Sequence, residues 1–328
     1  MNDAITMKVV SYLATLPRKE QYTSEQSYKA ATDKLNTLKF FIQGVQACGD
    51  EGVIEPEFNY QPSDVAVILG WVHEHGKTAP HLQLRQQILD GQRVYNGRTV
   101  IADSNLFLYK NTANPGYWLR YSFDGIFPNT GDYCDVAPDP NRWLSVQQHL
   151  GIKLRPWRTQ GNHILLCLQR DGGWSMGGFE VLDWAVKTIM QLRRYTNRPI
   201  RIRAHPGDKR AKKYCDRLTK LCIGRRLPNV ELSASGSSLE QDLKNCWAVV
   251  NHNSSPTVGA AIEGIPVFVT DPERSQARDI AETRLDKIET PITPDREAWI
   301  QRISQFHWSH QELRDGTAWA HMRKFVAK

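Results

Sequence analysis

The sequence predicts an α/β protein built on parallel sheets, and three observations lead to this prediction. Short apolar runs, which suit strands buried on both faces, alternate with segments of helical periodicity. Several of these runs stop at polar residues, as strands do where an open α/β sheet binds a ligand. The length of 328 residues fits two domains. We expect domains of residues 1–155 and 156–328, because the polar segment 153–162, with its Pro and Gly, is typical of a connection.

In the first domain we expect strands to alternate with amphipathic helices. The expected strands are residues 7–13, 64–71 and 98–103, and the expected helices are residues 24–46, 80–91 and 139–151. Leu35, Leu38 and Phe41 belong to the apolar stripe of the first helix. Residues 117–133 are aromatic but rich in Gly, Pro and Asn, so we expect a loop there. Its rings either stack on a sugar or a base or belong to the core.

The second domain continues the same alternation. The expected strands are residues 163–168, 199–203, 229–233, 247–250 and 265–269, and the expected helices are residues 179–195, 209–226 and 258–263. Residues 294–325 predict two further helices. Strands and helices that follow one another in this way favour a parallel sheet.

The candidate binding site consists of two polar segments of the second domain. The first follows the expected strand 199–203, and the second follows the expected strand 247–250. We expect them at the same edge of the sheet, where open α/β sheets bind ligands. The second segment contains helix-start signals, since Ser254 or Ser255 can cap and Pro256 suits the first turn. Free N–H groups and the helix dipole at such a start attract phosphate. The candidate binding residues are Arg203, His205, Lys209, Asn253, Ser254, Ser255, Thr257 and Glu263.

These segments resemble a known group of enzymes in four features. The features are an Arg-Ala-His-Pro segment at 203–206, an Asn-Ser-Ser turn at 253–255, a small-residue helix after it, and Gly-Ile-Pro-Val at 264–267. Together they resemble the donor-binding domain of GT-B glycosyltransferases over residues 160–275. The likeness is greatest to capsule-polysaccharide and phosphoglycerol-type transferases.

The resemblance implies a GT-B fold, in which two Rossmann-like domains face each other across a cleft and a last helix crosses back onto the first domain. It implies that the first domain is on the acceptor side and that the second binds the nucleotide sugar. It also implies sugar transfer from a nucleotide sugar, which we expect to be a UDP-sugar, without a further cofactor. One position departs from the pattern. Many GT-B enzymes place a ribose-binding Glu five residues before the Gly of Gly-x-Pro, where this chain has Gly259, whereas Glu263 directly precedes Gly264.

Three aspartates are candidates for the general base that an inverting transfer requires. They are Asp103, Asp124 and Asp171, and the sequence does not choose among them. We expect no catalytic metal, because the chain has no D-x-D motif. The His-Glu-His run at 73–75 also lacks the H-E-x-x-H spacing of zinc sites. We interpret that run as a loop that contacts substrate or is merely exposed.

The net charge of +7 is unevenly distributed. Residues 151–226 contain 18 Lys and Arg against 5 Asp and Glu, which gives +13 and leaves −6 for the rest of the chain. Such a region predicts a polyanionic partner, with a solvated helix surface as the alternative. We therefore favour double-stranded DNA with a hydroxymethylated pyrimidine as the acceptor, as in phage DNA glycosyltransferases. The alternatives are a cell-surface polysaccharide acceptor and a non-catalytic α/β module that binds nucleic acid.

The sequence also indicates in which cellular compartment the protein is expected. No apolar run approaches the roughly 18–20 residues that a membrane span needs, and the first residues lack the features of a signal peptide. Six cysteines show neither C-x-x-C nor metal spacing, which is typical of reduced thiols. We therefore expect a cytoplasmic protein without a membrane span.

Overall fold

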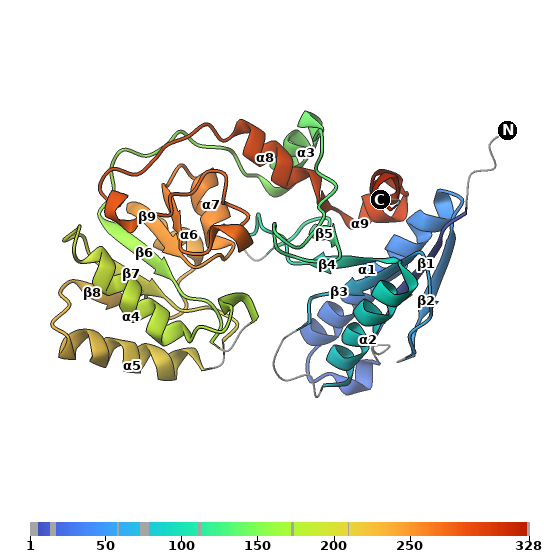
Figure 1. The fold of residues 1–328 in the computed structure, drawn as a ribbon, viewed down its shortest axis with the longest axis horizontal. Coiled ribbons are helices and arrows are strands. Elements are labelled where there is room, and N and C mark those ends of the chain that lie inside the picture. The colour runs from blue at the N-terminus through green and yellow to red at the C-terminus, as the bar shows by residue number, and fades with distance from the viewer. Residues whose placement is uncertain are drawn as a thin grey trace.

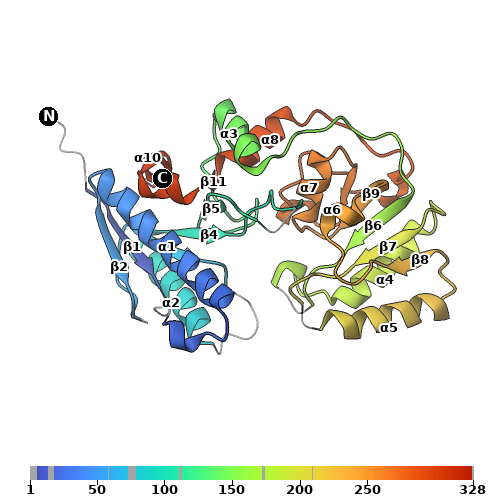
Figure 2. The same ribbon diagram turned by 180° about the vertical axis from the view of Figure 1, so that it is seen from behind.

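The structure of the protein is a computed structural model that describes residues 6–13, 18–57, 59–72, 79–110, 113–171, 174–208 and 210–326. It confirms the predicted α/β fold, because two Rossmann-like domains, each with its own sheet, lie beside each other (Figure 1). Figure 2 shows that the chain passes between them after α3 (Pro140–Leu150) and again before α8 (Glu297–Gln305). The exact boundary at residue 155 stays a prediction.

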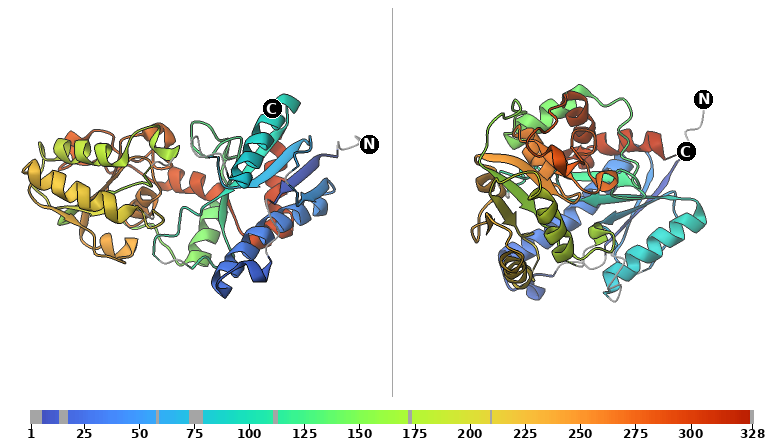
Figure 3. Two further views of the ribbon diagram at one scale, coloured as in Figure 1. Left: turned by 90° about the horizontal axis from the view of Figure 1, so that it is seen from below. Right: turned by 60° about the vertical axis from the view of Figure 1, so that its left-hand side comes forward.

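Among the described residues, the first sheet has six strands in the order β11-β5-β4-β3-β1-β2. The strands are β1 (Lys8–Tyr12), β2 (Glu51–Glu55), β3 (Val65–Leu69), β4 (Arg98–Asp103), β5 (Leu119–Phe123) and β11 (His307–Trp308). Strands β1 to β4 are parallel, whereas β5 is antiparallel to both of its neighbours. Helices α1 (Glu25–Ala47) and α2 (Pro80–Tyr95) cover opposite faces of this sheet (Figure 3, left). The reason is that the crossovers β1–α1–β2 and β3–α2–β4 are both right-handed but run in opposite directions along the sheet.

The second sheet, within the described residues, has five parallel strands in the order β10-β9-β6-β7-β8. The strands are β6 (His163–Cys167), β7 (Ile200–Arg203), β8 (Val230–Leu232), β9 (Cys246–Asn251) and β10 (Val267–Val269), and the helices are α4 (Val181–Leu192), α5 (Ala211–Gly224), α6 (Leu239–Asp242) and α7 (Pro256–Ile262). Ile164 and Leu166 of β6 pack with α4, whereas Leu165 and Cys167 pack with α7. Both faces are buried, which is why β6 is a continuous apolar run.

Three strands are not predicted by the sequence. The expectation of a loop at residues 117–133 is wrong for β5, and β2 directly after α1 is unexpected. The tail contains α8, α9 (His310–Arg314), α10 (Thr317–Met322) and β11, instead of two helices alone. β5 pairs with β11, which lies far along the chain, so the local sequence contains little signal for either strand.

The C-terminal tail returns to the first domain and completes its core. Trp319 of α10 is almost fully buried against Phe41 of α1, with ring centroids 5.9 Å apart. Its Nε1 donates a hydrogen bond to Oδ2 of the buried Asp50, 2.7 Å away. Arg323 Nε donates to the same oxygen, also at 2.7 Å. The tail is therefore attached to the segment after α1 by both apolar packing and a paired charge.

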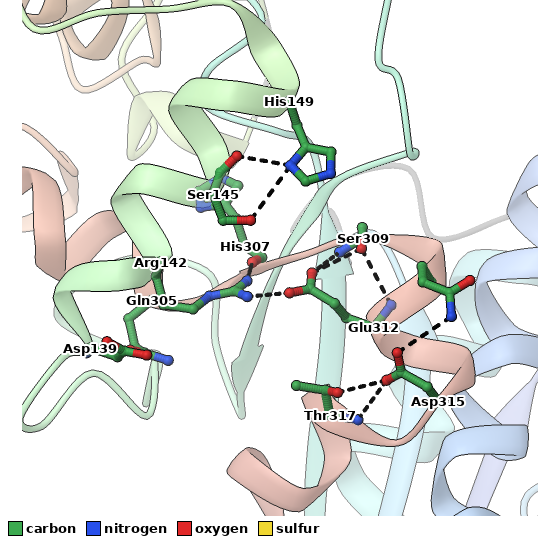
Figure 4. Close-up of polar contacts among 11 residues, drawn as sticks. Asp139, Arg142, Ser145, His149, Gln305, His307, Ser309, Glu312, Asp315 and Thr317 are labelled. Carbon is green, nitrogen blue, oxygen red and sulfur yellow. Dashed lines mark hydrogen bonds and ion pairs between the residues drawn. The ribbon is translucent and has the colours of Figure 1, made fainter.

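Arg142 of α3 connects the tail to the segment between the domains (Figure 4). Its guanidinium forms an ion pair with Glu312 of α9 and donates a hydrogen bond to the carbonyl of His307 in β11. It also lies 3.9 Å above the ring centroid of Trp308. Because Arg142 is buried, these contacts offset the cost of burying its charge. They hold α3, α9 and β11 together as one unit.

Three features of the described part of the chain concern membranes, metals and thiols. None of its helices is both long and apolar enough to cross a bilayer. None of its His, Cys, Asp and Glu side chains form a group of three or more that could hold a metal ion. Its six cysteines are all free thiols. The His-Glu-His run at 73–75 lies outside the described residues.

The segment between the domains is fixed to the second domain at Gly264. Arg155 N donates to the carbonyl of Ile262 at 2.8 Å, and Arg158 N donates to the carbonyl of Gly264 at 2.6 Å. Gly264 has a φ of +78°, and a Cβ at this position would lie 1.9 Å from the carbonyl oxygen of Pro156. A side chain there would strain the backbone and push the segment away from α7.

We expect Gly264→Ala to destabilise the protein much more than Gly151→Ala. Both glycines have a positive φ, and at Gly151 nothing lies within 4 Å of the added Cβ. Backbone strain of about 1 kcal/mol is common to both variants, whereas the clash at Gly264 adds about 2 kcal/mol or more. Urea unfolding of the two variants measures the difference. Equal losses in the free energy of unfolding would contradict this close contact.

Candidate functional site

A pocket of about 340 Å³ lies between the two domains. We call it the interdomain pocket. The first domain lines it with Asp103, Ser104, Leu106, Arg120 and Phe127. The second domain lines it with Gln169, Arg170, Ser175, His205, Asn253, Ser254, Ser255, Arg274 and Gln276. The structure thus brings together five predicted site residues, which are Asp103, His205, Asn253, Ser254 and Ser255.

The interdomain pocket lies where the strand order of the second sheet reverses. From β6 the chain proceeds through β7 to β8 at one edge, and it then returns to β9 on the other side of β6. The connections that leave β6 and β9 therefore diverge, and their divergence leaves a crevice at the carboxyl ends of the strands. Arg170 follows β6 and Ser254 follows β9, so both lie at this crevice.

Asn253 holds the loops around the crevice together. Its Oδ1 accepts a hydrogen bond from Gln169 Nε2 at 2.9 Å. Its Nδ2 donates to the carbonyl of Ser175 and to Asp271 Oδ2, both at 2.9 Å. These bonds use both ends of a buried amide. Asn253 therefore positions the loops, and its side chain has little capacity left for a ligand.

His205 offers a hydrogen-bond donor to the interdomain pocket. Gly207 N donates to His205 Nδ1 at 3.0 Å, and because a backbone N–H can only donate, the proton of the neutral ring lies on Nε2. Burial and the neighbouring Arg170 cation lower the pKa of His205, which favours the neutral ring. Nε2–H suits an anionic oxygen, and a bound anion would raise this pKa again.

Two arginines give the wall of the second domain positive charge. Arg170 is exposed and forms no ion pair with any residue that the structure describes. Arg274 is half-buried, and its nearest carboxylate oxygen, on Asp271, is 4.0 Å away. The Arg274 guanidinium also lies 5.4 Å from the ring centroid of Phe127 in the first domain. Because neither cation is closely paired, the interdomain pocket attracts an anion.

Several buried polar atoms of the interdomain pocket have no hydrogen-bond partner among the described residues. Both amide atoms of Gln276, which is 5% exposed, are unpartnered. Ser254 Oγ and Arg120 Nε are unpartnered as well. Nearly all buried polar groups in proteins have partners, and an unmet group costs about 1–3 kcal/mol. Three separate segments thus present polar groups to the interdomain pocket that a polar ligand would satisfy.

Asp103 supplies a carboxylate to the interdomain pocket. It ends β4 and lies opposite Arg120 of β5 in the antiparallel ladder. Arg120 Nη2 donates a hydrogen bond to Asp103 Oδ2. Asp103 Oδ1 accepts no hydrogen bond from any described residue. One carboxylate oxygen is thus held in position while the other is available to accept a proton.

Arg203 and Thr257, both predicted to bind the ligand, do not line the interdomain pocket. Arg203 Nη1 donates to Asp242 Oδ2 at 2.5 Å, so its charge is neutralised within the second domain. Thr257 is fully buried, and its Oγ1 donates to the carbonyl of Ser254 at 2.9 Å. Helix α7 has only seven residues, and the side chain of its N-cap, Ser255, makes no capping bond. The positive charge of the pocket comes from arginine side chains instead.

Glu263 lies at the opposite end of α7 and connects the two domains. It accepts a hydrogen bond from Tyr109 Oη at 2.7 Å and pairs with Lys110 Nζ at 3.2 Å. Tyr109 also explains the departure at Gly259, because a Cβ there would lie 2.6 Å from the Tyr109 side chain. A glutamate at this position therefore does not fit. Lys209 lies outside the described residues.

The other two candidate bases lie outside the interdomain pocket. Asp124 is at the opposite edge of the first sheet, where its carboxylate pairs with Arg98 at the start of β4, 2.9 Å away. Asp171 follows Arg170 but forms an ion pair with Arg210 at 3.4 Å. Neither lines the pocket that holds the positive charge.

Sequence reasoning missed Arg170, Arg274, Gln276 and Arg120. Arg170 had a usable signal, because it lies in the loop that begins after Cys167, the last residue of the first strand of the second domain. Arg274 and Gln276 lie in an irregular segment after β10 that contains no motif. Their presence in the pocket depends on tertiary packing alone.

Part of the positive charge predicted for residues 151–226 is neutralised by ion pairs within the second domain. Five arginines of this region form ion pairs there, namely Arg158, Arg198, Arg201, Arg203 and Arg210. Four exposed cations of α5 form none with any described residue, namely Lys212, Lys213, Arg217 and Lys220. Unpaired positive charge is thus found on α5, along the outer side of the domain (Figure 1).

Comparison with known proteins identifies the fold. No protein-family model matches the chain, and no curated protein matches it. The KpsC β-Kdo 2,7 transferase of Thermosulfurimonas dismutans is similar with a TM-score of 0.52 and 12% identity, over 95% of this chain and 99% of that one. The KpsC β-Kdo 2,4 transferase of the same organism gives 0.50 and 13%, over 92% of each chain. The likeness extends over both domains and confirms the GT-B type of fold.

We expect the interdomain pocket to bind inorganic pyrophosphate through Arg170. Arg170→Gln should weaken binding about tenfold or more, because it removes a charge-assisted hydrogen bond. Arg194→Gln removes another exposed arginine of the second domain that lies outside the pocket, and it should leave binding unchanged. Isothermal titration calorimetry measures both affinities. Equal losses in the two variants would show that only general surface charge attracts the anion.

The affinity for pyrophosphate should also rise as the pH falls below about 7. A bound anion raises the lowered pKa of His205, so binding takes up a proton and is favoured at lower pH. His205→Gln keeps a donor but cannot become charged, and it should lose this part of the pH dependence. Ionisation of pyrophosphate itself is common to both proteins, so the difference between their profiles isolates His205. Parallel profiles would exclude His205 from the site.

Proposed function

We propose that the protein is a glycosyltransferase that moves a sugar from a nucleotide-sugar donor to an acceptor hydroxyl. The observation that best supports this is the interdomain pocket, which combines the open Asp103 carboxylate with the cations Arg170 and Arg274. Sugar transfer needs a base for the hydroxyl and positive charge for the diphosphate leaving group. Two similar structures that are named as transferases also support this reaction class.

In this proposal the donor diphosphate binds to the wall of the second domain. Arg170 and Arg274 neutralise its charge, and His205 Nε2 donates to a phosphate oxygen. Ser254 Oγ and the Gln276 amide gain the partners that they otherwise lack. Preorganised cations of this kind stabilise a leaving diphosphate without a metal ion. We propose a UDP-sugar as the donor, without a further cofactor.

Asp103 is the proposed base. As the acceptor oxygen attacks the anomeric carbon, its proton passes to Asp103 Oδ1. The bond between that carbon and the phosphate oxygen breaks, and the nucleoside diphosphate leaves with the electron pair. Attack opposite the leaving group inverts the anomeric configuration. Arg120 keeps Asp103 in position through Oδ2.

We expect Asp103→Asn to lower sugar transfer about a hundredfold or more, because an amide cannot accept the proton. Asp124→Asn removes a carboxylate at the far edge of the sheet and should keep transfer in folded protein. Release of nucleoside diphosphate from a panel of UDP-sugars, with acceptor present, measures both. Transfer should survive EDTA, since arginines supply the charge. Wild-type activity in Asp103→Asn, or loss with EDTA that manganese restores, would refute this assignment.

A cell-surface polysaccharide is our first candidate for the acceptor. The Arg-Ala-His-Pro and Asn-Ser-Ser segments resemble capsule-polysaccharide transferases, and they follow the strands that border the interdomain pocket. Double-stranded DNA with a hydroxymethylated pyrimidine is the second candidate. It is favoured by the four unpaired cations on α5, which could contact a phosphate backbone.

Salt dependence separates the two acceptors. If α5 binds duplex DNA, log affinity should fall with log salt with a slope of about −0.9 per phosphate contacted. Charge reversal at Lys212 and Lys213 should make the slope shallower and leave pyrophosphate binding intact. Fluorescence anisotropy of a labelled duplex between low and physiological salt measures the slope. Weak binding without a slope would exclude DNA, and nucleic-acid binding without any release of nucleoside diphosphate would indicate a non-catalytic module.

A further inference from the structure

A second pocket, of about 470 Å³, lies within the first domain. We call it the first-domain pocket. It is bordered by the carboxyl ends of β1 and β3 and by the first turns of α1 and α2. The site described above uses none of its residues. Its apolar wall includes Tyr12, Ile68, Leu84 and Ile88, and its cations are Lys34 and Arg85.

The first-domain pocket lies at the position where open α/β sheets bind ligands. The chain leaves β1 toward β2 on one side and leaves β3 toward β4 on the other, although β1 and β3 are neighbours. Helices α1 and α2 therefore diverge to opposite faces of the sheet, and a crevice opens between the strand ends. The interdomain pocket has the same relation to β6 and β9 in the second sheet.

Within the part of the chain that the structure describes, the cations of the first-domain pocket have no acidic partner. Arg85 is half-buried, and its Nη1 donates to the carbonyl of Trp71 at 3.2 Å. Neither Arg85 nor Lys34 forms an ion pair with any described residue, and no Asp or Glu that the structure describes lines the pocket. Burial and the Arg85 and Lys34 cations lower the pKa of the adjacent His81. The pocket is thus positively charged and lacks an anion that would balance it.

The apolar wall of the first-domain pocket suits a ring. A ligand of this pocket would therefore contain a ring in addition to the acidic group that the cations bind. Tyr12 Oη donates to the carbonyl of Gln61 at 2.8 Å and accepts from its N–H at 2.9 Å, so the hydroxyl is already satisfied. Tyr22 and Leu69, which are half-buried, add apolar surface that a ligand can contact. The volume corresponds to a ligand of about one or two sugar units. An extended polymer would therefore enter with its terminal unit only.

The first-domain pocket adjoins the proposed base. Arg85 Nη1 lies 3.4 Å from the place that a Cβ on Gly70 would take. Gly70 N donates to the carbonyl of Ala102 at 2.7 Å, and Asp103 is the next residue of β4. Asp103 is also close enough to raise the pKa of Arg85, although burial lowers it more. A ligand on Arg85 would thus be held beside the carboxylate that activates the acceptor.

We propose that the first-domain pocket binds the terminal unit of the acceptor, and that this unit is an acidic sugar. Its carboxylate or phosphate pairs with Arg85 and Lys34, and its ring lies on the apolar wall. The inference rests on the proposed function, because it assigns the acceptor of that reaction. It favours an acidic polysaccharide over DNA, and it gives the cations of α5 the same polyanion to contact.

The test compares two probes that differ only at C6, which is a carboxylate in 4-nitrophenyl β-D-glucuronide and a hydroxymethyl group in 4-nitrophenyl β-D-glucoside. The glucuronide should bind the wild-type protein about tenfold more tightly or better, because its acid gains charge-assisted hydrogen bonds. Arg85→Gln and Lys34→Gln should each reduce this preference. Arg93→Gln removes an exposed arginine near the other end of α2 and should preserve it. Calorimetry of the four proteins with both probes gives the affinities.

Equal or absent binding of the two probes, or a preference that survives Arg85→Gln, would overturn the inference. Thymidine 5′-monophosphate bound more tightly than the glucuronide, and weakened by Arg85→Gln, would assign the pocket to nucleic acid instead. Pyrophosphate binding in the same samples reports the donor site independently. If the glucuronide preference is found while no UDP-sugar is turned over, the proposed function fails and the acidic ligand site stands. If instead UDP-sugars are transferred to neutral acceptors and Arg85→Gln does not change the rate, the proposed function stands and the acidic acceptor site fails.

Discussion

Parallel strands present all their carboxyl ends at one edge of a sheet, and both pockets of this protein depend on that constraint. In each sheet the strand order reverses once, between β6 and β9 and between β1 and β3. The edges meet because the tail returns to the first domain, where β11 extends its sheet and Arg142 joins α3 to α9. Asp103 at the end of β4 lines the interdomain pocket, and the first-domain pocket lies at the ends of the nearby strands β1 and β3.

The polar groups near these crevices are of two kinds. Asn253 and the Glu263–Tyr109 pair are fully engaged, and they fix the loops and the contact between the domains. Gln276 and Arg85 retain unused hydrogen-bonding capacity, although leaving such groups unpartnered in a buried position costs free energy. The engaged groups therefore stabilise the scaffold, whereas Gln276 and Arg85 can bind a polar ligand without losing an ion pair to a described residue.

The sequence predicts elements well where the signal is local. The apolar run of β6 and the Asp139 and Ser24 caps of α3 and α1 place those elements within a few residues. β11 escapes prediction because it has two residues and pairs with β5 far back along the chain, and β5 because it lies between β4 and β11 in a stretch rich in Gly, Pro and Asn. The same holds for the site. His205 follows a strand and is found by position, whereas Arg203 two residues earlier turns to Asp242, which no local pattern reveals.

The return of the tail has a consequence for synthesis on the ribosome. The strands of the second sheet all lie within residues 163–269, so this sheet can form as soon as that stretch emerges. The first domain is translated earlier but lacks β11 and the Trp319 ring until the last part of the chain is made. Its nascent form leaves one edge of β5 unpaired and one side of α1 uncovered. The domain made first is thus completed last, and chaperones have the longest access to it.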